Sequence, residues 1–118
     1  MNFKDKEALL KVRKEVEEKI GNSVFCIFSN DKFLEVIPRE AGKGNALVHI
    51  CDRENIKLQN SYAFADEEND ISMIKAAGLG VGVANTVEAM KAECDVITDA
   101  DYLHNAVAEV IRKYILSE

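Results

Sequence analysis

The sequence predicts an α/β protein in which a helix and a hairpin precede a parallel sheet. From residue 43 onward, short apolar runs alternate with amphipathic segments, and such alternation builds βαβ units around a parallel sheet. Before that point, one helical segment is followed by two apolar runs across a short turn, which is typical of an antiparallel hairpin. We therefore place a boundary near residues 38–42 and expect two units, 1–40 and 41–118.

The composition is that of one small globular protein. The chain has 118 residues, of which 47% are hydrophobic and 31% are charged. A net charge of −6 argues against a nucleic-acid partner, which would need a basic face. No apolar run is long enough to span a membrane, and the N-terminus has no signal-peptide core. Cys26, Cys51 and Cys94 form no CxxC pair, so we expect small buried thiols and a cytoplasmic location.

The N-terminal unit is expected to contain a helix and two strands. The helix covers residues 4–20, and its apolar stripe is Leu9, Val12, Val16 and Ile20. Strands are predicted over residues 24–28 and 33–37, joined by a turn at Asn30-Asp31 and closed by Pro38.

The second unit alternates helices and strands. The predicted elements are a helix from 43 to about 54, a strand over 62–65, a helix from 71 to 77, a strand over 79–84, a short helix over 85–91, a strand over 95–97 and a final helix. The apolar side of the final helix is expected to carry Leu103, Val107, Val110, Ile111 and Tyr114.

An acidic segment, residues 65–70, joins one predicted strand to the following helix. In an open parallel sheet, ligands bind just outside the carboxyl ends of the strands. Asp66, Asn69 and Asp70 lie within one turn of each other, and an oxygen-rich loop suits a hard cation such as Mg²⁺. The same residue types also cap helices and favour the positive end of the helix dipole. From the loop alone, helix capping is the favoured interpretation.

Lys43 stands between two glycines at a predicted helix start. Such a loop lets backbone N–H groups and an ammonium converge on an anion, although a lone lysine there also fits a flexible surface loop. Together with a metal-binding carboxylate on an adjacent loop, Lys43 would neutralise a phosphoryl group.

Two other motifs favour structural interpretations. The glycines of residues 78–82 follow a helix and enter a strand, the reverse of a dinucleotide fingerprint, so they indicate a helix stop and close packing. Asp99 and Asp101 follow a strand as an Asp-x-Asp pair, which is the arrangement of an aspartyl phosphoryl-transfer nucleophile. Tyr102 follows instead of the Gly-Thr of such a loop, and capping of the final helix is the simpler interpretation. His49 and His104 are expected on helices without an acidic partner.

Four segments match a known family in order and separation: GKGNAL at 42–47, ADEENDISM at 65–73, AGLGVGVAN at 77–85 and CDVIT at 94–98. In combination they resemble the C-terminal half of Cof-type sugar-phosphate phosphatases of the haloacid dehalogenase superfamily. The resemblance runs from about residue 24 to the end. It implies that residues 41–118 form half of a Rossmann-like core, with a partial parallel sheet, and that residues 1–40 are a remnant of the cap domain.

The resemblance also implies roles for individual residues. In that family an aspartate nucleophile forms an aspartyl-phosphate with the help of Mg²⁺. Asp66 is implied to be a metal ligand, Lys43 to bind the transferring phosphoryl group and Asn69 to contact the substrate phosphate. Asp70 is implied to orient Lys43 and to support the metal shell. The catalytic residues would thus be Lys43 and Asp70, and the substrate a small phosphorylated molecule.

The sequence departs from the family in ways that affect activity. The Asp-x-Asp-Gly-Thr nucleophile motif, the Ser/Thr phosphate motif and most of the cap are absent, Ala65 replaces a glycine, and His104-Asn105 replaces Asp-Gly. Because no covalent step occurs without a nucleophile, we expect negligible phosphatase activity from this chain alone. It would be a fragment, a split gene product or a truncated paralogue. The alternative is a non-catalytic phosphate- or metal-binding module, or an interaction protein on the same fold.

A sheet without its first strands would expose an apolar edge. We therefore expect either self-association, by edge pairing or by exchange of the N-terminal helix and hairpin, or a partner that supplies the missing N-terminal half.

Overall fold

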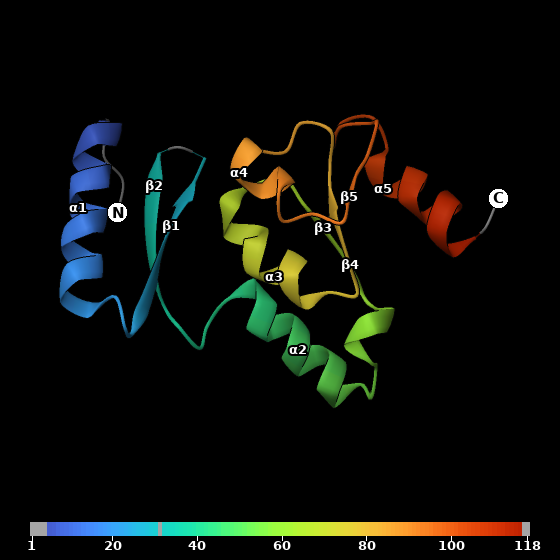
Figure 1. Cartoon of the computed structure of the whole chain (residues 1–118), viewed down its shortest axis with the longest axis horizontal. Helices are drawn as coiled ribbons and strands as arrows, with labels where there is room; N and C mark the ends of the chain where they lie inside the picture. The colour runs from blue at the N-terminus through green and yellow to red at the C-terminus, as the bar shows by residue number, and fades with distance from the viewer. Residues whose placement is uncertain (1–4, 31, 117–118) are drawn as a thin grey trace.

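A computed structural model describes residues 5–30 and 32–116 and contains two separate sheets. One is a two-stranded antiparallel sheet and the other a three-stranded parallel sheet. The molecule measures 49 × 32 × 20 Å, with the first helix and the hairpin at one end and the last helix at the other (Figure 1). This arrangement confirms the predicted α/β fold class.

The N-terminal unit is α1 (Lys6–Ile20) packed on the hairpin of β1 (Val24–Ser29) and β2 (Phe33–Pro38). Asp5 caps the helix, because its carboxylate accepts a hydrogen bond of 2.9 Å from the Glu7 N–H. The buried core of this unit is Leu9, Cys26 and Leu34, bordered by Val12, Val16, Val24 and Phe28.

Some details of this unit differ from the prediction or fall outside the described residues. Each strand extends one residue further, to Ser29 and to Pro38, because the antiparallel ladder continues to both of its ends. Ile20, predicted for the apolar stripe, is 50% exposed because it is the last residue of the helix. Residue 4 of the predicted helix and Asp31 of the predicted turn lie outside the described residues.

The parallel sheet consists of β3 (Tyr62–Ala65), β4 (Leu79–Gly82) and β5 (Val96–Ile97), in the order β3-β4-β5. Because the strands are parallel, their carboxyl ends lie at one edge of the sheet, where ligands bind in folds of this kind. The core of this unit is Ala63, Ala65, Ile74 and Met90, packed against Ile71, Met73, Ala77 and Cys94.

The helical elements are α2 (Lys43–Arg53), α3 (Ile71–Ala76), α4 (Glu88–Lys91) and α5 (Ala106–Val110), with tighter or wider turns at η1 (Leu58–Asn60), η2 (Glu68–Asp70) and η3 (Ile111–Ile115). Helices α2 and α3 lie side by side (Figure 1). Gly44 permits this approach, since a Cβ there would lie 2.4 Å from the backbone oxygen of Ser72. Gly78 likewise packs against Gln59, in agreement with the close packing predicted for that segment.

The strand predicted over residues 79–84 ends at Gly82, and the helix predicted over 85–91 begins only at Glu88. The cause is a pair of hydrogen bonds to the end of β3. The Thr86 hydroxyl and the Val87 N–H donate to the backbone oxygen of Asp66 at 3.0 and 3.1 Å. These bonds hold the intervening chain as a turn and delay the helix.

The final helix also starts later than predicted, at Ala106, and Leu103 precedes it with 71% of its surface exposed. Asp101 closes a separate turn instead of capping the helix, because its carboxylate accepts the Leu103 N–H at 2.9 Å and contacts His104 Nδ1 at 2.6 Å. His104 therefore lies in a turn with an acidic partner, contrary to the prediction. Asn105 enters the helix at φ +67°, a conformation that asparagine tolerates better than most residues. Of the five predicted apolar-side residues, only Val110 is buried.

The three cysteines are free thiols. Cys26 and Cys51 are buried as expected, whereas Cys94 is half-buried. Burial raises the pKa of the Cys26 thiol and of the Cys94 thiol above the ordinary value. No helix in the described part of the chain is both long and apolar enough to cross a membrane.

Candidate functional site

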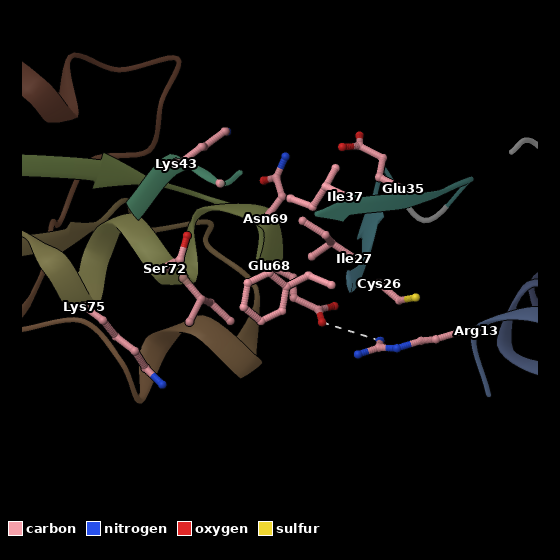
Figure 2. A pocket seen from close by; sticks show the side chains of 13 residues that line it. Arg13, Cys26, Ile27, Glu35, Ile37, Lys43, Glu68, Asn69, Ser72 and Lys75 are labelled. Atoms are coloured by element: carbon pink, nitrogen blue, oxygen red, sulfur yellow. Dashed lines mark ion pairs between the residues drawn. The ribbon is translucent and has the colours of Figure 1, made fainter. Parts of the chain in front are cut away.

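The candidate site lies where the hairpin meets the first turns of α2 and α3. A pocket of about 440 Å³ opens there between the two units (Figure 2). Its walls come from α1, from the hairpin, from the loop before α2 and from the η2–α3 segment; the residues are Arg13, Phe25, Cys26, Ile27, Glu35, Ile37, Gly42, Lys43, Glu68, Asn69, Ile71, Ser72 and Lys75.

Lys43 is the first residue of α2 and points its ammonium toward Asp70. The preceding Gly42 adopts φ +157°, a conformation that would be strained in a residue with a side chain. Its carbonyl oxygen accepts a hydrogen bond of 2.9 Å from the Ala46 N–H. The Asn45 side chain donates to the backbone oxygen of Glu40 at 3.0 Å. These contacts fix the backbone position from which the Lys43 side chain projects.

Asp70 ends the turn η2 and is only 6% exposed. Burying a carboxylate is costly unless it is paired, and here the Lys43 ammonium donates a hydrogen bond to Asp70 Oδ1. The Lys43 side chain remains half exposed, so solvent screens the pair and its contribution to stability is modest. The pair therefore acts mainly to place a cation beside the pocket.

A backbone contact that the sequence did not reveal locks the two helices together. The Gly44 N–H donates to the Ser72 hydroxyl at 3.1 Å, across the same approach that Gly44 permits. Lys43 immediately precedes Gly44, and Asp70 lies two residues before Ser72. The approach of α2 to α3 therefore sets the distance between the two charged groups.

Asn69 lines the same pocket as Lys43. In Figure 2, the side chains of Lys43 and Asn69 point toward the same side of the pocket, one from α2 and the other from η2. An ammonium and a side-chain amide facing one space can both donate hydrogen bonds to a phosphate oxygen.

The acidic loop also holds the two units together. Glu68 forms an ion pair of 3.5 Å with Arg13 of α1, drawn as a dashed line in Figure 2. The carboxylate of Glu67 accepts the Asn30 N–H at 3.1 Å. Two of the carboxylates that suggested helix capping or metal binding thus contact the N-terminal unit.

Asp66 is half-buried at the carboxyl end of β3 and does not line the pocket. Its backbone oxygen is held by Thr86 and Val87, while its carboxylate makes no hydrogen bond or ion pair with any described residue. A free carboxylate suits Mg²⁺, which typically takes one or two protein carboxylates with substrate phosphate and water. Among residues 5–30 and 32–116, no group of three or more His, Cys, Asp and Glu side chains is arranged to hold a metal ion.

The Asp-x-Asp pair after β5 is tied into its own loop. Both oxygens of the Glu109 carboxylate accept backbone N–H groups, from Asp99 at 3.2 Å and from Ala100 at 3.1 Å. The hydrogen bond with His104 lowers the pKa of the Asp101 carboxyl below its ordinary value. The side chain of Asn85 accepts the Tyr102 N–H at 3.4 Å.

Sequence reasoning missed the pocket wall that the hairpin supplies. Phe25, Ile27, Glu35 and Ile37 lie on the face of the hairpin that is turned away from the Leu9–Cys26–Leu34 core. One signal was available, since Glu35 is the single charge within an otherwise apolar strand.

Comparison with known proteins gives consistent findings. A family model described as haloacid dehalogenase-like hydrolase matches residues 1–111. The chain is 34% identical over 110 residues to the 5-amino-6-(5-phospho-D-ribitylamino)uracil phosphatase of Bacillus subtilis, covering 93% of this chain and 41% of that protein. It is 30% identical over 112 residues to the HMP-PP phosphatase of Klebsiella pneumoniae, covering 94% of this chain and 41% of that protein.

Solved structures give the same result. A haloacid dehalogenase-like hydrolase from Bacillus subtilis is 30% identical and superposes with a TM-score of 0.81, covering 97% of this chain and 39% of that one. The chain therefore spans about two fifths of the length of these relatives.

Proposed function

Because the chain belongs to the haloacid dehalogenase-like hydrolase family, we propose that it forms the C-terminal part of a Mg²⁺-dependent, Cof-type phosphatase for small sugar-phosphate esters. The observation that carries the proposal is the pairing of Lys43 with the buried Asp70 at the mouth of a pocket. The relatives are named as phosphatases of small phosphorylated molecules, which supports the same class of substrate.

Each residue has a definite part in this proposal. Lys43 binds the phosphoryl oxygens and Asn69 donates a second hydrogen bond to them. Asp70 orients the Lys43 ammonium through their ion pair. Asp66, with Asp70 in support, would hold Mg²⁺, which supplies a further positive charge against the phosphate.

The proposal assigns no nucleophile to this chain. Neither Asp99 nor Asp101 lines the pocket that Lys43 lines, and the Asp101 carboxylate is engaged by its own loop. We expect the isolated chain to bind phosphate without hydrolysing esters. Turnover of a phosphate ester that disappears in Asp99→Asn would contradict this part of the proposal.

The phosphate site can be tested by titrating inorganic phosphate into the ¹⁵N-labelled chain with Mg²⁺ and following amide shifts. Lys43→Met should weaken binding by about tenfold or more, because it removes a charge-assisted hydrogen bond. Lys75→Met is the matched control, since Lys75 lines the same pocket but pairs with Glu93 at 3.4 Å. Equal effects of the two substitutions would show that Lys43 has no special part in binding.

We also propose that β3 pairs with a strand from another chain, either a second copy or an N-terminal half that supplies the nucleophile. Leu79 and Val83 donate to the backbone oxygens of Ser61 and Ala65, so the N–H and C=O groups of Tyr62 and Phe64 face the other edge. Phe64→Pro would block that edge without removing a bond to β4. It should lower the apparent mass in sedimentation if pairing occurs there.

A non-catalytic phosphate- or metal-binding module remains the second candidate, because the sequence lacks the Asp-x-Asp-Gly-Thr motif that would carry the nucleophile. Mixing the chain with a polypeptide that carries the Asp-x-Asp-Gly-Thr strand separates the two candidates. Restored turnover that depends on Lys43 favours the phosphatase, and its absence favours the module.

A further inference from the structure

The hairpin gives the pocket one mixed wall. In the antiparallel ladder, Phe25 faces Ile37 and Ile27 faces Glu35, and all four side chains line the pocket. Alternation along the strands places them on the face away from α1. The hairpin therefore lines the pocket with three apolar side chains and one carboxylate.

Among the residues that the structure describes, Glu35 has no counter-charge, unlike the other charged residues of the pocket. Arg13 pairs with Glu68, Lys43 with Asp70, and Lys75 with Glu93. Within the part of the chain that the structure describes, the Glu35 carboxylate makes neither an ion pair nor a hydrogen bond. A carboxylate can only accept hydrogen bonds, so Glu35 is available to a donor that enters the pocket and repels an anion that does so.

The direction of the side chains relates Glu35 to the proposed phosphate site. Figure 2 shows Glu35, Lys43 and Asn69 pointing toward the same side of the pocket, from β2, α2 and η2 respectively. The leaving group of a phosphate held by Lys43 and Asn69 can therefore extend toward the hairpin wall of the same pocket.

We propose that Glu35 is a specificity-determining residue that selects phosphate monoesters with a neutral, hydroxyl-bearing leaving group and disfavours those with a carboxylate. The inference rests on the phosphate site of the proposed function. A hydroxyl donates to the Glu35 carboxylate, while the carbon skeleton packs on Phe25, Ile27 and Ile37. A carboxylate in the same position meets the like charge of Glu35 and is repelled by it, and because Glu35 is exposed, solvent screens part of this repulsion.

The test compares three probes on the full chain with Mg²⁺, again by amide shifts: inorganic phosphate, glycerol 3-phosphate and phosphoglycolate. The wild-type chain should bind glycerol 3-phosphate roughly three- to tenfold more tightly than phosphoglycolate, the size expected for one like-charge contact that water screens. Glu35→Gln should reduce this ratio to within about twofold, mainly by improving the binding of phosphoglycolate.

Glu40→Gln is the matched control, because Glu40 is exposed, lies five residues away and does not line the pocket, and because the substitution changes the net charge equally. It should leave the ratio unchanged. A ratio that Glu35→Gln does not move, while inorganic phosphate still binds, overturns the role of Glu35 and leaves the phosphate site standing. No binding of inorganic phosphate overturns the proposed function, and the assignment of Glu35 with it.

Discussion

Two acidic loops follow strands of the same parallel sheet, and they use their carboxylates differently. In the loop after β3, Asp70 receives a hydrogen bond from Lys43, which lies 27 residues earlier on another helix. In the loop after β5, Asp101 receives its hydrogen bonds from Leu103 and His104, two and three residues further along. The first carboxylate connects two elements of the fold, whereas the second closes a single turn.

The origin of the partner, and not the acidic composition, separates a candidate site from a loop that closes its own turn. Asp70 is buried and pairs with Lys43 of α2, which lines the pocket. The Asp101 carboxylate satisfies its own loop, and the Glu109 carboxylate occupies the N–H groups of Asp99 and Ala100. A ligand would have to break these local bonds before it could use them.

The largest effect on the loop after β3 is expected from a substitution that separates α2 from α3. Gly44→Ala places a methyl group against the backbone of Ser72, so it should destabilise the fold by about 2–3 kcal/mol and weaken phosphate binding. Chemical denaturation and the phosphate titration measure the two effects. Ser72→Ala, which removes only a hydrogen bond, should cost about 1 kcal/mol. If Gly44→Ala cost no more than that, the close approach would not be what positions Lys43.

The next largest effect is expected when the carboxylates of Asp70 and Asp101 are removed in turn. Asp70→Asn removes the charge that pairs with Lys43, and it should lower the free energy of unfolding by about 1–2 kcal/mol and weaken phosphate binding severalfold. Asp101→Asn should cost much less stability and leave phosphate binding unchanged, because its partners are local and exposed. Equal losses of phosphate affinity in the two variants would remove the distinction between the loops.

The smallest expected effect is a pH dependence confined to the second loop. Because the folded pKa of Asp101 is lowered, its contribution to stability is complete above its ordinary pKa of 3.8 and is lost as the pH falls below that value. Thermal melts of wild type and Asp101→Asn should therefore differ at neutral pH and converge in acid. A difference that instead grows as the pH falls would contradict the sign of the shift.

The sequence predicted the elements whose patterns are local. The two apolar runs of the hairpin, the helix that starts at Lys43 and the strand at residues 62–65 were each visible in a few neighbouring residues. The start of the last helix was not, because the turn closed by Asp101 competes with a helix pattern that begins at Leu103. Local hydrogen bonding decided that competition.

The candidate site was predictable only in part, for a different reason. Family resemblance singled out Lys43, Asp66, Asn69 and Asp70. The structure gathers Lys43, Asn69 and Asp70 beside one pocket, whereas Asp66 does not line it. The hairpin wall with Glu35 could not be placed, because the face of the hairpin that meets the second unit depends on contacts between residues far apart in sequence. Pairs such as Asn30 with Glu67 leave no periodic trace.

The contacts of Glu67 and Glu68 with the N-terminal unit have a thermodynamic consequence. These residues immediately precede Asn69 and Asp70 on one short segment, so the same backbone both grips the hairpin and presents the ligand groups. A ligand that binds one conformation of this segment more tightly changes the free energy with which the hairpin packs against the segment. By linkage, packing of the hairpin changes the binding free energy of the ligand by the same amount. Binding at the site and docking of the N-terminal unit are therefore thermodynamically linked wherever the bound and free forms of this segment differ.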